Sequence, residues 1–175
     1  VCLTNTVLVG NGAFIYVTNQ SQNVAAYTSS SGVFQEAGAG FCYAHGASGL
    51  RRAGTNNIDA QLLADLAVRT VDPPVILSTN YLLTNDPSWY PTAARGSTPV
   101  SIGYHYDAID FAICLAAVDS SHSLTVKPGT VVACYGTGGL RAKSDSTLSI
   151  LGQAQSPVTI TCFINVQEQT GVWSN

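Results

Sequence analysis

The stretch YHYDAID, residues 104–110, is the densest group of side chains able to do chemistry. On a strand, alternate side chains face the same way, which places His105 with Asp107 on one face and Asp110 on the other. An imidazole beside a carboxylate can share a metal ion or act as an acid–base pair. Calcium would suit the carboxylate oxygens, but it takes about six to eight ligands and this stretch supplies few. The favoured interpretation is structural, with Asp107 bonded to backbone N–H groups of a turn and no cofactor.

Arginines offer a second chemistry, because Arg51 and Arg52 together with Arg69 or Arg95 can bind an acidic sugar. Lyases built on parallel β-helices go further and remove a proton beside a uronate carboxylate, with a basic residue near bound calcium. The set available here for that reaction is Asp107, Asp110 and Arg95. No motif supports a lyase, so ordinary surface charge is the simpler interpretation.

Trp89 and Tyr90 form an aromatic pair in a stretch rich in proline. Their ring faces can stack on a sugar while polar neighbours bond its hydroxyls, which makes them candidates for glycan binding. The simpler interpretation is that they pack this stretch onto the rest of the fold.

The chain has five cysteines at wide spacings and no CxxC pair, which excludes a zinc ribbon and a thioredoxin-like motif. Cys134 and Cys162 both lie in strand-like runs and are candidates for a disulfide between neighbouring strands, although the pairing is not fixed by the sequence. Cys42 and His45 resemble a nucleophile and its base, but a strand followed by a turn places them on opposite faces and no orienting third group is evident.

Composition restricts the class of protein. Charged residues make up 10% of the chain, well below the roughly 25% of an average soluble protein. Hydrophobic residues make up 46%, yet no apolar run approaches the ~18 residues that would predict a membrane span. The net charge of −3, without a basic stripe, argues against nucleic acid as a partner. We therefore expect a folded extracellular or cell-surface protein that is not inserted in a membrane.

A short amphipathic α-helix is predicted over about residues 57–69, followed by a long loop containing prolines up to residue 99, in which VILSTNYLL (75–83) could be a strand. The apolar residues of the helix recur at helical spacing: Ile58, Leu62, Leu63, Leu66 and Ala67. Asn56 or Asn57 can cap its first turn, and Pro73-Pro74 lies beyond its end.

Short strands at regular intervals dominate the rest of the chain. In the range 123–162 the predicted strands start at positions 124, 131, 140, 148 and 158, and Pro128-Gly129, Gly138-Gly139 and Pro157 stand at corners between them. The two-residue links of a hairpin sandwich and the ~40-residue repeat of a propeller are missing there. Residues 1–41 also alternate apolar runs with turn signals, such as Asn-Gly at 11–12. This rhythm predicts an all-β fold, a parallel β-helix whose inward side chains form stacks.

Three stretches resemble the repeats of right-handed parallel β-helices in large surface and secreted proteins of the Verrucomicrobia–Planctomycetes type. They are LTVKPGTVVACYGTGGLRAKSDSTLSILGQAQSPVTITC (124–162), AGFCYAHGASGLRRAGTNNID (39–59) and STPVSIGYHYDAID (97–110). The VQEQ segment at 166–169 is similar to a segment that follows the coils in such proteins. The resemblance implies a right-handed solenoid and says little about function, because the motifs are structural.

We therefore expect one β-helical domain over residues 1–175, as a segment of a longer chain. Its predicted parts are strand coils over 1–55, a helix and loop insertion over 56–99, and strand coils over 100–175. The favoured function is a structural segment of an extracellular fibre, stalk or adhesin, whose partners are copies of itself or neighbouring coils. A module that binds surface glycans is the first alternative, and a polysaccharide lyase or hydrolase is the second.

Overall fold

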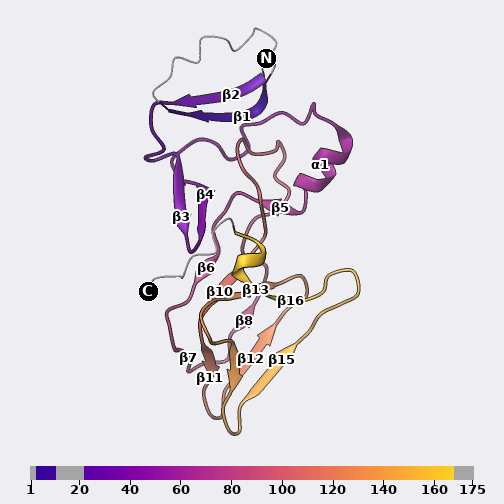
Figure 1. Cartoon of the computed structure of the whole chain (residues 1–175). Coiled ribbons are helices and arrows are strands. Elements are labelled where there is room, and N and C mark those ends of the chain that lie inside the picture. Colours follow the sequence, from indigo (N-terminus) through magenta and orange to yellow (C-terminus); the bar gives the residue numbers. More distant parts are fainter. Residues whose placement is uncertain (1–2, 11–21, 168–175) are drawn as a thin grey trace. The chain divides into compact units, whose positions relative to one another are not determined.

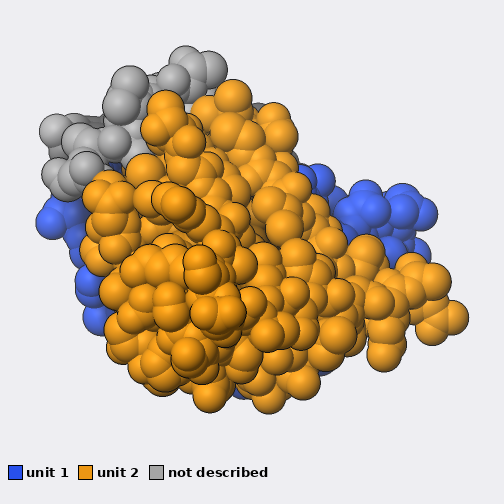
Figure 2. Space-filling view, turned by 90° about the horizontal axis from the view of Figure 1, so that it is seen from below, with its two compact units in different colours: residues 1–36, 40–73, 94–107 blue, residues 37–39, 74–93, 108–175 orange. Residues whose placement is uncertain are grey.

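The computed structural model describes residues 3–10 and 22–167, and these form short strands with one short α-helix (Figure 1). The prediction of an all-β fold is confirmed. The predicted Asn-Gly turn at 11–12 and the end of the VQEQ segment lie outside the described residues. The chain divides into two compact units, coloured separately in Figure 2. Unit 1 comprises Val1–Glu36, Gly40–Pro73 and Ala94–Asp107, and unit 2 comprises Ala37–Ala39, Pro74–Ala93 and Ala108–Asn175. The predicted single domain over residues 1–175 stays a prediction.

Unit 2 contains three parallel sheets. Sheet 1 has the order β16-β13-β10-β6, with bounds Thr159–Cys162, Val131–Cys134, Phe111–Ile113 and Val75–Ile76. Sheet 2 has the order β14-β11-β7, with bounds Leu140–Ala142, Ala116–Val118 and Tyr81–Leu83. Sheet 3 has the order β15-β12-β8, with bounds Thr147–Ile150, Ser123–Val126 and Ser88–Trp89. A short 3-10 helix, Phe163–Asn165, follows β16.

The chain visits the three sheets in the same order three times. We call the three passages triplet 1 (β6, β7, β8), triplet 2 (β10, β11, β12) and triplet 3 (β13, β14, β15); β16 then returns to sheet 1. Each strand pairs in register with the strand of the next triplet, as Phe111 does with Val132 and Leu124 with Leu148. Parallel neighbours need a long crossover between them, which explains why hairpin links are missing from this part of the sequence.

The stretch VILSTNYLL (75–83), for which a strand was left open, contains β6 and β7, and the long proline-containing loop predicted up to residue 99 is wrong where β8 lies. Residues 75–89 contain β6, β7 and β8, which pair with the strands of triplet 2. Strands β6 and β8 have two residues each, too few to show a period-2 pattern in the sequence. Pro87 lies immediately before β8, where its missing N–H breaks no ladder bond.

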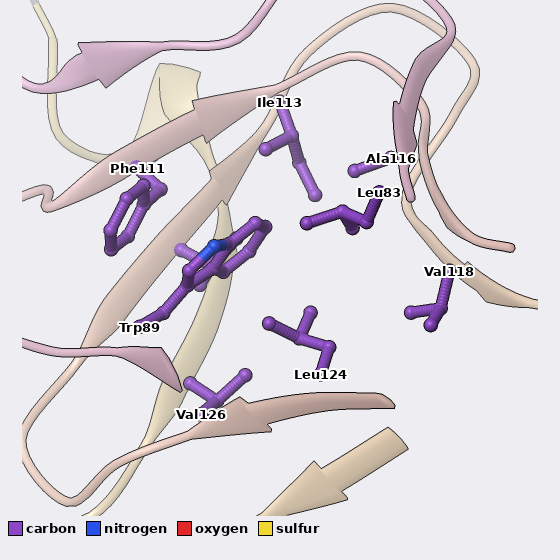
Figure 3. Packing of buried hydrophobic residues seen from close by; sticks show 9 residues of the cluster. Leu83, Trp89, Phe111, Ile113, Ala116, Val118, Leu124 and Val126 are labelled. Carbon is purple, nitrogen blue, oxygen red and sulfur yellow. The ribbon is translucent and has the colours of Figure 1, made fainter. Parts of the chain in front are cut away.

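The core of unit 2 lies between its three sheets. Figure 3 shows the side chains of this cluster, with the Trp89 ring stacked on Phe111 at a centroid distance of 4.6 Å and an interplanar angle of 17°. Sheets 2 and 3 supply the aliphatic side chains Leu83, Ala116, Val118, Leu124 and Val126. Each buried Val or Leu stabilises the fold by about 1.5–3 kcal/mol, so this cluster fixes the inward face of every triplet.

Unit 1 is built from smaller pieces. Strands β1 (Thr4–Val9) and β2 (Gln22–Tyr27) pair in parallel, and β5 (Arg69–Thr70) pairs antiparallel with β9 (Tyr106–Asp107). Strands β3 (Phe34–Ala37) and β4 (Gly40–Ala44) form a two-stranded sheet across a two-residue link, which only an antiparallel pair allows. The core of unit 1 contains Val33, Ala44, Leu50, Val71 and Ile102.

The single described α-helix, α1, spans Ala60–Leu66 and is shorter than the predicted 57–69. Its N-cap is Asp59, whose carboxylate accepts the N–H groups of Gln61 and Leu62 at 3.0 Å each. Asn56, one of the predicted caps, instead accepts the N–H of Val100 at 3.0 Å. Among the described residues, no helix has both the length and the apolar character needed to cross a bilayer.

Candidate functional site

Unit 1 carries a cleft of about 380 Å³ lined by residues from 51–52, 66–72, 94–101 and 105. Four of the chain's five arginines line it: Arg51, Arg52, Arg69 and Arg95. The hydroxyl residues of the lining are Thr70, Ser97, Thr98 and Ser101. We call this feature the arginine cleft.

The backbone conformation of Arg52 fixes the position of this residue at the cleft. Its φ angle of +55° is in the left-handed region, which a non-glycine residue adopts rarely, and its N–H donates to the Oγ of buried Ser101 at 3.1 Å. Two residues earlier along the chain, Leu50 is buried in the core of unit 1. The backbone is therefore anchored on both sides while the Arg52 side chain is exposed.

Arg51 mainly stabilises the wall of the cleft. Its Nε pairs with the Asp72 carboxylate at 2.5 Å, and its Nη2 donates to the Ala44 carbonyl at 2.8 Å. These bonds use two parts of the guanidinium within the fold. Arg51 therefore contributes less free charge to a ligand than an arginine facing solvent does.

Arg69 lies on β5 and faces Asp107 of β9, with 3.4 Å between its Nε and the nearer carboxylate oxygen. The two side chains are 43% and 64% exposed, so water screens the pair and its net energy is small. A ligand carboxylate can compete for Arg69 at little cost.

Arg95 is placed by the glycine that follows it. Gly96 has a φ of +60°, and a Cβ there would lie 2.5 Å from the carbonyl oxygen of Ala67. A glycine therefore lets the 94–98 segment approach the end of α1 and brings Arg95 to the cleft lining.

Cation charge dominates the cleft. Four arginines stand against one carboxylate in the lining, that of Asp72, although the whole chain has a net charge of −3. Guanidinium groups bind carboxylate, sulfate and phosphate through paired N–H donors, and the neighbouring hydroxyls can add hydrogen bonds. This donor set fits an anion and would repel a metal cation.

His105 also lines the arginine cleft. Its Nδ1 lies 3.0 Å from the Gly103 carbonyl oxygen, which can only accept, so Nδ1 carries the hydrogen and Nε2 keeps a free lone pair. Burial lowers the pKa of His105, and the positive charge of Arg69 lowers it further. The imidazole is therefore neutral around pH 7.

The predicted partnership of His105 with Asp107 does not extend to a shared site. His105 lines the arginine cleft, whereas Asp107 faces Arg69 in solvent and is not part of the cleft lining. Within residues 3–10 and 22–167 no group of three or more His, Cys, Asp or Glu side chains is arranged to hold a metal ion.

The Asp110 side chain has a structural role, because it does not face the solvent from which a substrate would reach an acid or base. It belongs to unit 2, is fully buried, and its carboxylate accepts the N–H groups of Thr92, Ala93 and Val131 at 2.7–3.0 Å. The predicted alternation along 104–110 fails because the β9 strand ends at Asp107. Asp107 and Arg95, the other members of the lyase set, belong to unit 1.

Trp89 does not present an exposed platform, which corrects its assignment to glycan binding. Its side chain is 6% exposed and stacks on Phe111 inside the core of unit 2. Tyr90 is 55% exposed, because successive residues of β8 and its continuation face opposite sides. Of the two candidates for glycan binding, only Tyr90 is therefore exposed.

The two cysteines predicted as disulfide partners are neighbours in sheet 1. Cys134 and Cys162 are paired in register across β13 and β16, and both are free thiols. Burial, followed by the nearby Cys162 and Cys114, raises the pKa of Cys134. His45, proposed with Cys42 as a nucleophile pair, accepts the N–H of Ala47 through Nδ1 at 3.2 Å and so has a role in the turn.

The sequence named the four arginines as possible partners, but it did not predict that His105 and the hydroxyl residues join them. Those residues come from segments up to about fifty positions apart, and a local sequence pattern does not predict which distant residues line the same cleft. Comparison with protein-family models, with curated proteins and with solved structures finds no match to this chain.

Proposed function

We propose that this chain is a binding module for acidic glycans, that is, for sugar polymers carrying carboxylate or sulfate groups. The observation that carries the proposal is the gathering of Arg51, Arg52, Arg69 and Arg95 around one cleft of unit 1. A volume of about 380 Å³ is in the range of small-ligand sites. The low charge of the rest of the chain makes this concentration of cations a local feature rather than a general basic surface.

A glycan fits better than a nucleic acid. A nucleic-acid surface needs a stripe of cations along the phosphate backbone, and the chain has a net charge of −3 with its other three cations, Lys127, Arg141 and Lys143, in unit 2. A compact cleft suits a uronate or sulfated sugar, whose ring hydroxyls need partners as well, and Ser97 and Thr98 are the lining hydroxyl residues that are not buried. Such polymers are extracellular, in keeping with the predicted location.

Titration of the purified chain with polygalacturonate, heparin and neutral dextran tests this function. We expect binding to at least one acidic polymer that weakens with added salt, and none to dextran, because the attraction is between screened charges. Arg52→Ala and Arg69→Ala should each weaken binding by about tenfold or more, which corresponds to about 1.5–3 kcal/mol for a lost charged hydrogen bond.

Arg141→Ala is the matched control, since it removes the same side chain from an exposed position of β14 in unit 2. The proposal is wrong if this control weakens binding as much as Arg52→Ala does. It is equally wrong if dextran binds as tightly as the acidic polymers, or if a DNA duplex binds more tightly than any of them.

We infer that the three sheets of unit 2 are the sides of a right-handed parallel β-helix that presents this module as part of a longer extracellular assembly. The cyclic strand order and the in-register parallel pairing support the inference. Among the described residues, the strands of triplet 1 and the strands β14, β15 and β16 each have one partner. Their open ladders can accept a further coil or a second copy.

Electron microscopy and light scattering of the purified chain test the assembly. Filaments, or a mass that grows with concentration, would support end-to-end pairing of the open strands. Monodisperse single particles at every concentration would refute pairing between copies.

A further inference from the structure

A second hollow of unit 1 is lined by residues that directly precede His105 of the arginine cleft along the chain. It measures about 330 Å³ and is lined by Asn5, Thr6, Val7, Phe34, Gly103 and Tyr104. Residues 103–105 are consecutive, and the ring of His105, which lines the cleft, contacts the Gly103 carbonyl at 3.0 Å. The segment from Gly103 to His105 therefore forms the border between the hollow and the arginine cleft.

Tyr104 presents a fixed aromatic ring at this border. Its side chain is 51% exposed, and its ring packs edge-on against Tyr106 at 4.7 Å and 67°. Tyr106 is buried, stacks on buried Tyr43 at 4.2 Å, and accepts the N–H of Cys42 through its hydroxyl at 2.8 Å. Because the rings behind Tyr104 are held by packing and a hydrogen bond, the exposed ring is in place before any ligand arrives.

Gly103 keeps the hollow open. Its φ is +104°, and a Cβ there would lie 3.2 Å from Val7 Cγ2 and 4.0 Å from Phe34 Cε1. A side chain at this position would be strained and would fill the space between these residues. Thr6, also in the lining, donates its hydroxyl hydrogen to the Thr4 carbonyl at 3.0 Å, which leaves oxygen lone pairs able to accept a hydrogen bond from a ligand.

We propose that this hollow is a second sugar subsite, in which a neutral sugar stacks on Tyr104 while the acidic sugar linked to it is bound by the arginine cleft. The inference rests on the proposed function and adds the composition of the ligand: acidic and neutral sugars joined in one chain. The C–H face of a pyranose is apolar and matches an exposed aromatic ring, whereas the described residues that line the hollow include no charged side chain to attract a second uronate.

Calorimetric titration with glucuronic acid, and with a disaccharide of glucuronic acid and a neutral hexose, tests the subsite. We expect the wild-type chain to bind the disaccharide about fivefold to tenfold more tightly than the monosaccharide. Tyr104→Ala should remove this gain and leave the affinity for glucuronic acid unchanged, and Tyr104→Phe should keep the gain. Tyr104→Leu fills the space against Tyr106 without a flat ring, so it should also lose the gain if the fold is intact by circular dichroism.

Tyr90→Ala is the matched control, because Tyr90 is a similarly exposed tyrosine of unit 2 and should leave both affinities unchanged. If glucuronic acid binds but the disaccharide binds no more tightly, or if the gain survives both Tyr104→Ala and Tyr104→Leu, the subsite is refuted and the arginine cleft stands. If no acidic sugar binds the wild-type chain, the proposed function itself fails.

Discussion

Asp110 and Val131 are joined by two hydrogen bonds that connect triplets 2 and 3. The N–H of Val131 donates to Oδ2 of Asp110 at 2.7 Å, and the N–H of Asp110 donates to the Val131 carbonyl at 2.9 Å. The Asp110 carbonyl in turn accepts the N–H of Val75, the first residue of β6, at 2.9 Å. Asp110, a fully buried residue that precedes β10, thus forms hydrogen bonds with the neighbouring strands β6 and β13 of sheet 1.

Substitution of Asp110 should therefore cost stability rather than catalysis. Asp110→Asn replaces a carboxylate oxygen with an NH₂ group facing backbone N–H donors, and we expect the free energy of unfolding to fall by about 2–4 kcal/mol in urea titrations. Asp107→Asn is the control: its exposed pair with Arg69 should be worth at most about 0.5–1 kcal/mol. Equal losses in the two variants would contradict the structural role of Asp110.

Gly138 and Gly139 give a second matched pair at the corner between β13 and β14. A Cβ on Gly138 would overlap the backbone oxygen of Cys114, whereas a Cβ on Gly139 would meet nothing within 4 Å. Neither glycine has a positive φ, so the comparison isolates the steric effect.

We expect Gly138→Ala to lower the free energy of unfolding by about 1–3 kcal/mol or more, because the corner can no longer close on triplet 2. Gly139→Ala should change it by about 0.5 kcal/mol or less. Thermal or urea unfolding of the two proteins is the measurement. A destabilised Gly139→Ala with an unaffected Gly138→Ala would contradict the close approach of Gly138 to the Cys114 backbone.

The strands of residues 123–162 were predictable because each has a corner signal beside it. Predicted starts at 124, 131, 140, 148 and 158 lie within one residue of the starts of β12 to β16. Pro-Gly and Gly-Gly stand where the chain must turn, and the runs between them are long enough to show alternation. In triplet 1, β6 and β8 have only two residues each, and they pair with strands of triplet 2 that lie far along the sequence.

The site was less visible because tertiary contacts decide it. The alternation of side chains along residues 104–110 predicted that Tyr106 and Asp110 face the same side, and both are indeed buried. The strand ends at Asp107, however, and Ile109, which the alternation places on the other side, is buried as well. Burial of Trp89 rather than exposure likewise follows from its stacking on Phe111, twenty-two residues later. Local sequence patterns do not predict contacts between residues so far apart in the chain.

The cysteines of sheet 1 should differ in reactivity despite being register partners. Cys162 is exposed at the edge strand β16, whereas burial and the neighbouring thiols raise the pKa of Cys134. Since the thiolate is the reactive form, iodoacetamide at pH 8 should label Cys162 about tenfold faster than Cys134. Peptide mass spectrometry over time measures both rates. In urea the two rates should converge, and equal rates in the folded protein would contradict the burial of Cys134.

His105 should make glycan binding depend on pH. In the free protein, burial and the charge of Arg69 hold the pKa of His105 below its ordinary value of about 6.5, so the imidazole is neutral. A carboxylate bound in the arginine cleft favours the imidazolium and raises that pKa, so binding takes up a proton. By linkage, affinity must then increase as the pH falls through the region below about 6.5.

We expect a uronate ligand to bind more tightly at pH 5.5 than at pH 7.5, and to weaken below about pH 4, where its own carboxylate becomes protonated. His105→Gln should remove the increase between pH 7.5 and 5.5, while His122→Gln, which alters a histidine of unit 2, should retain it. Calorimetry in buffers of different ionisation enthalpy measures the proton uptake directly. A pH profile shared by the wild type and His105→Gln would show that this imidazole does not sense the ligand.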